Sequence, residues 1–151
     1  MSDSKNSCVI AALDLSEDAR AVAERACRLA ACLEVPACLV HVVDEAAVVN
    51  PANEFSLGGL VAGEFEEKEV EAGLAARRYL EKVLGPVLTD CAVDLEILEG
   101  RPAARLEEHA RETKAAMIVM GQPEHRFGSL VTHLSRHAPC DVHIVRTPDS
   151  D

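Results

Sequence analysis

Short apolar segments alternate with amphipathic, helix-like segments along nearly the whole chain, and this alternation constrains the fold more than any other feature. The expected strands lie at 8–13, 37–43, 93–98, 117–120 and 142–145, and the expected helices at 16–33, 64–84, 102–113 and 129–137. The first strand is apolar throughout, as strands buried on both faces are. The alternation predicts an α/β fold, with a doubly wound parallel sheet covered by helices on both faces.

The length of 151 residues indicates a single domain with room for an ordinary core. We place the folded domain at residues 8–146. The polar start, residues 1–7, is expected to be a disordered N-terminus, and residues 147–151 a polar C-terminal tail. No internal repeat, low-complexity segment or second domain is expected.

The charge and composition exclude several classes of partner. The formal net charge is −11, which disfavours binding to nucleic acid or to an anionic membrane surface. Aromatic residues make up only 3% of the chain, so few side chains could stack on bases. No apolar run has the length of a membrane span and the start does not resemble a signal peptide, so we expect a cytoplasmic protein.

Six scattered cysteines agree with a reducing compartment. None forms a C-x-x-C motif, and most occupy apolar positions, where a thiol behaves as a small hydrophobic side chain. A thiol redox sensor remains a lesser alternative, because sequence alone does not show which cysteine is exposed or has a low pKa.

Asp14 follows the first expected strand at the turn into the first helix. Its carboxylate could accept a hydrogen bond from an adenine amino group or from a ribose hydroxyl. It could equally support the turn in which Ser16 caps the helix. The spacing of the residues leaves both interpretations open.

A second turn, from Gly121 to Ser129, joins the fourth strand to the last helix. Glycine allows close approach of the backbone, and the free amides at a helix start attract anions, so this is a phosphate site in outline. Pro123 lacks an amide, however, and Glu124 carries a negative charge. The segment matches neither G-x-G-x-x-G nor a Walker loop.

Two histidines four residues apart, His133 and His137, could share one helix face, as zinc ligands do. No Glu lies between them to act as a base, and a solvated helix face explains the spacing equally well. We expect no metal site.

Taken in order, several segments resemble the universal stress protein family. They are Val-Ile-Ala-Ala-Leu-Asp-Leu-Ser-Glu from Val9, Leu-Val-His-Val-Val from Leu39, Leu-Glu-Gly-Arg-Pro from Leu98, Ala-Met-Ile-Val-Met-Gly from Ala116, and the stretch from Gly128 to Val145. The resemblance covers essentially residues 8–146 and implies a five-stranded parallel sheet of order 3-2-1-4-5. In that order Asp14 and Gly121 face one crevice at the point where the chain reverses direction. The resemblance also implies a homodimer formed through the last strand, from Val142 to Val145.

One branch of this family binds ATP through a pattern of three spaced glycines followed by Ser or Thr. Here Gly121 matches the first glycine, but Glu124 occupies the second place and Leu134 the third, and the stretch from Gly121 to Gly128 is too short. The chain therefore resembles the A-type branch, which lacks this pattern.

The resemblance predicts a stress-response regulatory or interaction protein that is not an enzyme, has no expected cofactor and acts on an unknown protein partner. The alternative is a nucleotide-dependent regulator that binds ATP or AMP, with at most slow ATPase activity. Its site would comprise Asp14 with Val42 or Val43 for the adenosine, and Gly121, Gly128 and Ser129 for the phosphates.

Overall fold

The fold is an all-parallel, five-stranded sheet with the order β3-β2-β1-β4-β5, which confirms both the predicted α/β class and the strand order. The computed structural model describes residues 7–45, 62–122 and 129–146. The strands are β1 (Val9–Ala12), β2 (Ala37–Asp44), β3 (Leu95–Gly100), β4 (Met117–Gly121) and β5 (Asp141–Val145). The helices are α1 (Ala19–Leu33), α4 (Ala62–Leu84), α5 (Pro86–Asp90), α6 (Pro102–Glu112) and α7 (Ser129–His137).

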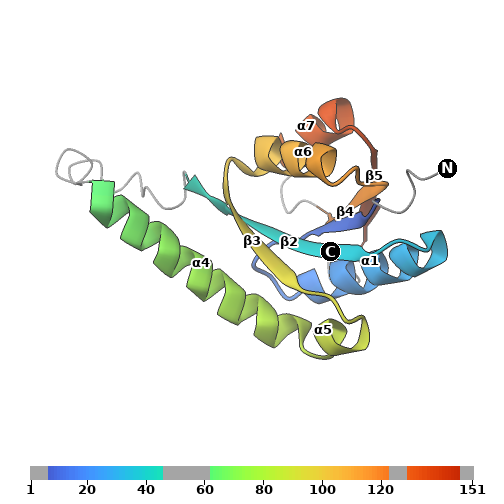
Figure 1. The fold of residues 1–151 in the computed structure, drawn as a ribbon, viewed down its shortest axis with the longest axis horizontal. Helices are drawn as coiled ribbons and strands as arrows, with labels where there is room; N and C mark the ends of the chain where they lie inside the picture. Colours follow the sequence, from blue (N-terminus) through green and yellow to red (C-terminus); the bar gives the residue numbers. More distant parts are fainter. Residues whose placement is uncertain (1–6, 46–61, 123–128, 147–151) are drawn as a thin grey trace.

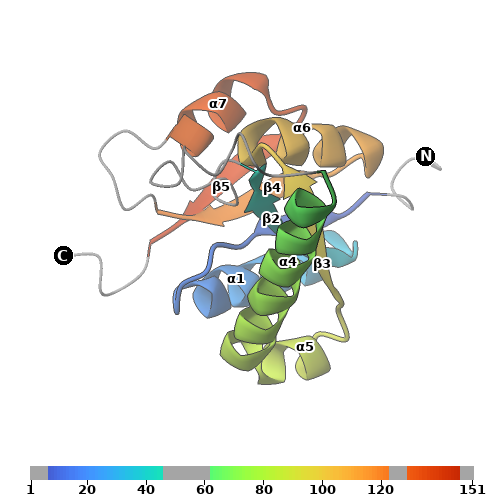
Figure 2. The same cartoon turned by 90° about the vertical axis from the view of Figure 1, so that its left-hand side faces the viewer.

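Helices cover both faces of the sheet: α1, α4 and α5 lie on one side and α6 and α7 on the other (Figures 1 and 2). The strand period of two residues divides the core in the same way. Val9 and Ala11 of β1 belong to the cluster beneath α1 and α4, whereas Ile10 belongs to the cluster beneath α6 and α7. All three side chains are fully buried, because β1 is the central strand.

Helix α1 begins later than its sequence suggests. Ser16 does not cap it, since Asp18 is the N-cap residue and its side chain makes no cap hydrogen bond. The Ser16 hydroxyl instead accepts a hydrogen bond from the Asp18 amide at 3.2 Å and donates one to Asp14. At the other end of α1, the helical spacing of apolar residues places Leu33 on the inward face, but its side chain is 47% exposed. Because α1 begins at Ala19 and Ser16 lies before it, the turn after β1 is longer than predicted.

The inward face of α4 agrees with the apolar pattern of the sequence only in its last turn. That pattern places Val70, Leu74, Val83 and Leu84 inward; Val83 and Leu84 do pack in the core, but Val70 and Leu74 are 58% and 51% exposed. The buried positions on this helix are Ala76, Leu80 and Leu84. These buried positions share one side of the helix, and Val70 and Leu74 lie on the other side.

The short helix α5 is an element that the sequence interpretation missed. Gly85, with φ of 40°, ends α4 as expected. Pro86 then starts a new five-residue helix, a position that suits proline because the first helical amide has no partner inside the helix. Val87 anchors α5 in the core beside α1 and α4.

Two expectations about the chain ends concern residues mostly outside those that the structure describes. The expected disordered N-terminus, 1–7, overlaps them only at Ser7, and the tail 147–151 lies beyond them. In the described part of the chain no helix combines the length and the apolarity needed to cross a bilayer.

Candidate functional site

The carboxyl ends of β1, β2 and β4 surround a cavity of about 250 Å³. In the register, Ala12 of β1 pairs with Val40 of β2 on one side and with Met120 of β4 on the other. The chain leaves β1 towards β2 on one side and leaves β4 towards β5 on the other. The ends of β1 and β4 therefore leave a crevice between them, where open α/β sheets bind ligands. The residues that line it are Ala12, Leu13, Asp14, Val40, His41, Val42, Pro102, Leu106, Met120, Gly121, Gln122, Leu130 and Val131.

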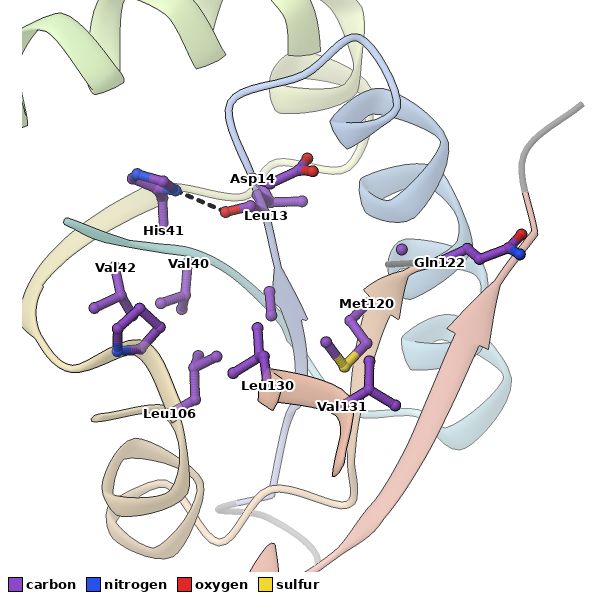
Figure 3. Close-up of a pocket in the computed structure, with 13 residues that line it drawn as sticks. Leu13, Asp14, Val40, His41, Val42, Leu106, Met120, Gln122, Leu130 and Val131 are labelled. Carbon is purple, nitrogen blue, oxygen red and sulfur yellow. Dashed lines mark hydrogen bonds between the residues drawn. The ribbon is translucent and has the colours of Figure 1, made fainter. Parts of the chain in front are cut away.

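Helices α6 and α7 supply the apolar wall of the cavity. Leu106 of α6 and Leu130 and Val131 of α7 approach the strand residues Val40 and Met120 (Figure 3). Sequence reasoning did not place any of these five residues in the site. Val40 could have been found from the strand period, because it lies two residues before Val42 and shares its face.

Asp14 lies at the rim of the cavity and is exposed to solvent. Its Oδ1 accepts a hydrogen bond from the Ser16 hydroxyl at 2.7 Å. Among the described residues its other oxygen has no hydrogen-bond partner, and the carboxylate points away from the apolar wall (Figure 3). Asp14 therefore takes part in the turn, as one of the two interpretations predicts, and a contact with adenine or ribose stays a prediction.

His41 of β2 fixes the end of β1 and was not foreseen as a site residue. Its Nδ1 lies 2.7 Å from the carbonyl oxygen of Leu13 (Figure 3). Because a carbonyl oxygen only accepts, Nδ1 must carry the proton and donate it. The hydrogen bond thus holds the backbone directly before Asp14 in place.

The structure does not bring all the remaining predicted site residues together. Gly121 and Val42 line the cavity with Asp14, whereas Val43 points to the other face of the sheet and lines a different hollow beneath α4. Ser129 is exposed at the start of α7 and is not among the lining residues. Gly128 lies outside the described residues.

The electrostatics of the cavity do not favour a highly charged anion. None of the described lining residues is Lys or Arg, and Asp14 adds a negative charge at the rim. Ligand pockets typically measure about 300–1,000 Å³, and this cavity lies just below that range. It could hold a small, largely apolar or planar group that offers a hydrogen-bond donor to Asp14.

A polar cluster joins α6 to α7 beside the cavity. Glu107 accepts hydrogen bonds from Nε2 of His133 at 2.9 Å and from Arg111 at 2.6 Å. These two bonds, His133 first, lower the pKa of the Glu107 carboxyl below its usual value of 4.5. The ring of His133 lies 4.8 Å from that of His137. Within the described ranges no group of three His, Cys, Asp or Glu residues is arranged to hold a metal ion.

Comparisons with known proteins add family evidence to this geometry. The model of the universal stress protein family matches residues 7–146. The comparison with curated proteins gives no match. Similar solved structures include UspA from Lactobacillus plantarum, at 26% identity and a TM-score of 0.64, with 94% of this chain and 99% of that chain covered. A family member from Burkholderia pseudomallei is 29% identical with a TM-score of 0.57, covering 93% and 96%.

A third structure, the universal stress protein of Archaeoglobus fulgidus, was solved in complex with dAMP. It is 22% identical with a TM-score of 0.54 and covers 91% of this chain and 96% of that chain, a likeness that shows the fold. The match of the family model, which spans nearly the whole chain, settles the family. This chain belongs to the universal stress protein family.

Proposed function

We propose that the protein is a regulatory or interaction protein of the A-type branch, acting in the cytoplasm without tight binding of ATP. The cavity at the strand ends is the observation that carries this proposal. It offers an apolar wall and one carboxylate but no cation among the described lining residues, so this part of the site supplies no charge to compensate a triphosphate. Six free thiols agree with a reducing compartment.

Released nucleotide and thermal stability test the absence of tight ATP binding. The purified protein is denatured and the supernatant assayed for nucleotide, and the melting temperature is measured with and without Mg-ATP. We expect far less than one nucleotide per chain and almost no shift, since a ligand stabilises only in proportion to its binding to the folded state. About one nucleotide per chain, or a shift of several degrees, would refute the proposal.

The alternative function is nucleotide-dependent regulation through AMP or ATP, with at most slow ATPase activity. Two observations favour it: the dAMP complex of the Archaeoglobus fulgidus protein, and the rim oxygen of Asp14 that has no hydrogen-bond partner within the described ranges. Titration calorimetry with AMP and with adenosine separates the two functions. If the alternative holds, Asp14→Asn should weaken binding about tenfold, because the neutral amide oxygen is a weaker acceptor than the charged carboxylate. Asp18→Asn is the matched control, because Asp18 lies in the same turn outside the cavity.

We also propose that two copies associate through β5. This strand lies at one edge of the sheet, and edge strands are commonly covered by a partner. Its Ile144 side chain is 36% exposed, which gives the edge an apolar contact. The other partners of the protein are unknown, and the net charge of −11 argues against nucleic acid and anionic membranes among them.

Sedimentation at micromolar concentration tests the dimer. The wild-type protein should sediment as a dimer, and Ile144→Lys as a monomer, because the substitution places a charge in the contact. Leu33→Lys is the control, since Leu33 is equally apolar and 47% exposed on α1, away from β5. A monomeric wild-type protein would contradict the proposal.

A further inference from the structure

One face of α4 carries apolar side chains that remain more than half exposed. Val70 and Leu74 are 58% and 51% exposed, and because they stand four residues apart they lie side by side on the helix surface. Figure 2 shows α4 in front of the other elements, and no described helix or strand crosses its outer side. A contact with another surface would remove this apolar pair from water, which is favourable.

Two side chains of opposite charge extend this apolar pair along the helix. Glu67 lies three residues before Val70 and is exposed, and Arg77 lies three residues after Leu74 and is partly exposed. The successive spacings are therefore three, four and three residues, which keeps the four side chains on one stripe of the helix. We call these four residues the α4 stripe. Its spacing is symmetric about its middle, but its two ends carry opposite charges.

This pattern is complementary to itself when it is reversed. If a second copy brings its α4 against the first in the antiparallel direction, each Val70 faces a Leu74 and each Glu67 faces an Arg77. Every contact then forms twice, as a twofold symmetric interface requires. A parallel, in-register pairing would instead place Glu67 opposite Glu67 and Arg77 opposite Arg77, so the charges select the antiparallel direction.

We propose that the α4 stripe is an interaction surface for a second copy of this chain, which binds through its own α4 in the antiparallel direction. The proposal goes beyond the function proposed above and does not depend on it. Strand β5, the proposed dimer contact, lies at one edge of the sheet, whereas α4 packs on β3 at the other edge. There a Cβ added at Gly73 would lie 3.7 Å from Cγ2 of Ile97. The two surfaces are therefore separate, and both can be occupied at once.

The basic end of the stripe has capacity for a new partner. Within the described ranges, Nη1 of Arg77 lies 3.8 Å from Glu81 of the same helix, and the two side chains are 42% and 52% exposed. An exposed pair of this kind contributes little. A guanidinium has five N–H donors, so Arg77 can also bind the Glu67 carboxylate of a second copy. Removal of water around the neighbouring apolar pair strengthens that attraction, because it lowers the local dielectric constant.

The small size of the stripe limits the strength of this contact. It extends over about three helical turns on each copy, which is less than the stable interfaces that bury about 1,200–2,000 Å². We therefore expect association at about 0.1–1 mM, above the micromolar range in which the β5 dimer is tested. Because the net charge of −11 repels two copies at long range, the measurement belongs at about 0.15 M salt, where the screening length is about 8 Å.

An exchange of charges in the Ile144→Lys background tests the proposal, because this background removes any contribution of β5. Sedimentation velocity over the range of about 0.1–1 mM should show dimers of Ile144→Lys. Adding Glu67→Arg, or adding Arg77→Glu, should leave only monomers, since every charged pair would then join like charges. An equal mixture of these two variants should form dimers again, because one has two positive ends and the other two negative ends. Lys82→Glu is the control, since Lys82 is exposed on α4 outside the stripe, and it should keep the dimers.

Dimers in the mixture would also show that both charge variants fold, so their separate loss of association is not a loss of structure. Monomers of Ile144→Lys over the whole range would overturn the proposal. Dimers that persist in either charge variant, or a mixture that stays monomeric, would overturn it as well. If Ile144→Lys does not fold, the same series in the wild-type background decides the question: the wild-type particle should at least double in mass over this range, whether it starts as a monomer or as a β5 dimer, and the charge variants should not.

Discussion

At the scale of single residues, one glycine at the end of β3 has a backbone conformation that other residues avoid. Gly100 has φ of 136°, a region that is almost exclusive to glycine. The space around it is not tight, because an added Cβ would lie 3.6 Å from Cβ of Arg105. Gly100→Ala should therefore lower the free energy of unfolding by about 1–3 kcal/mol through backbone strain alone. Urea unfolding measures this change.

Gly121 provides the matched control for this prediction. Its φ is not positive, and an added Cβ would lie 3.4 Å from Cγ2 of Val22, at the edge of ordinary contact. Gly121→Ala should cost clearly less than Gly100→Ala. Equal losses in the two variants would show that crowding, and not φ, controls the effect at Gly100.

At the residue scale, the sequence predicted residues at the strand ends of the candidate cavity but not those of its helical wall. Asp14 and Gly121 stand at strand ends, and a parallel sheet brings strand ends together, so their placement was foreseeable. Helical spacing places Leu106 and Leu130 on the inward faces of their helices, but it does not identify them as cavity residues. Whether such a side chain fills the core or faces a cavity depends on how two helices pack, which no local pattern encodes.

At the scale of elements, α4 allows a direct test of which helix face supports the core. Leu80 is fully buried, whereas Leu74 is 51% exposed. Leu80→Ala should lower the free energy of unfolding by about 2–5 kcal/mol, because it removes buried methyl groups and leaves a cavity. Leu74→Ala should change it by less than about 0.5 kcal/mol, as surface substitutions do. A larger loss for Leu74→Ala in urea unfolding would indicate that α4 is rotated.

The error in the predicted face of α4 has a physical cause. The helix carries apolar residues on both sides, with Val70 and Leu74 on one and Ala76 and Leu80 on the other. Val70 and Leu74 are four residues apart, as Ala76 and Leu80 are, so hydrophobic periodicity fits either side. The side that packs on the sheet is the one that carries Gly73. A Cβ added at Gly73 would lie 3.7 Å from Cγ2 of Ile97 in β3. Only the tertiary contact decides between the two faces.

The junction of α6 and α7 should make stability depend on pH. The pKa of Glu107 is lowered in the folded state, so its stabilising effect is present above the pKa of the unfolded chain and is lost as pH falls through the folded pKa. Wild-type protein should therefore be more stable than Glu107→Gln at pH 7, and this difference should vanish well below the usual value of 4.5. Urea unfolding across this pH range measures the difference.

Glu108→Gln is the control for the junction. The Glu108 side chain is 63% exposed and 3.9 Å from Arg105, a surface pair that contributes little. This variant should match wild type at pH 7. A difference between wild type and Glu107→Gln that persists at low pH would show that packing, and not the carboxylate, joins the helices.

At the scale of the whole molecule, an excess of acidic residues should make stability sensitive to salt. The chain has 26 acidic and 15 basic side chains, and their net repulsion acts on the compact state. Salt shortens the screening length from about 30 Å at 0.01 M to about 8 Å at 0.15 M. The melting temperature should rise by a few degrees over this range, equally for sodium and potassium chloride. A fall would mean that attractive ion pairs outweigh the repulsion.

The overall architecture was the most predictable level of the structure. Alternation alone gave the parallel sheet, because strands linked by helical crossovers must run in the same direction. The strand order came from the family resemblance and not from local pattern, since any of several orders satisfies the same alternation. The short helix α5 escaped prediction because five residues are too few to show a helical period.

The strand order also determines when the sheet can be completed during synthesis. The central strand β1 pairs with β2 soon after both emerge, but its other edge pairs with β4, whose register begins at Val9 and Met117. More than a hundred residues must therefore be made before the middle of the sheet is closed. Long-range pairing of this kind slows folding and leaves an apolar strand edge open in the meantime. On the ribosome, the central strand of this protein therefore emerges long before the strand that covers its second edge.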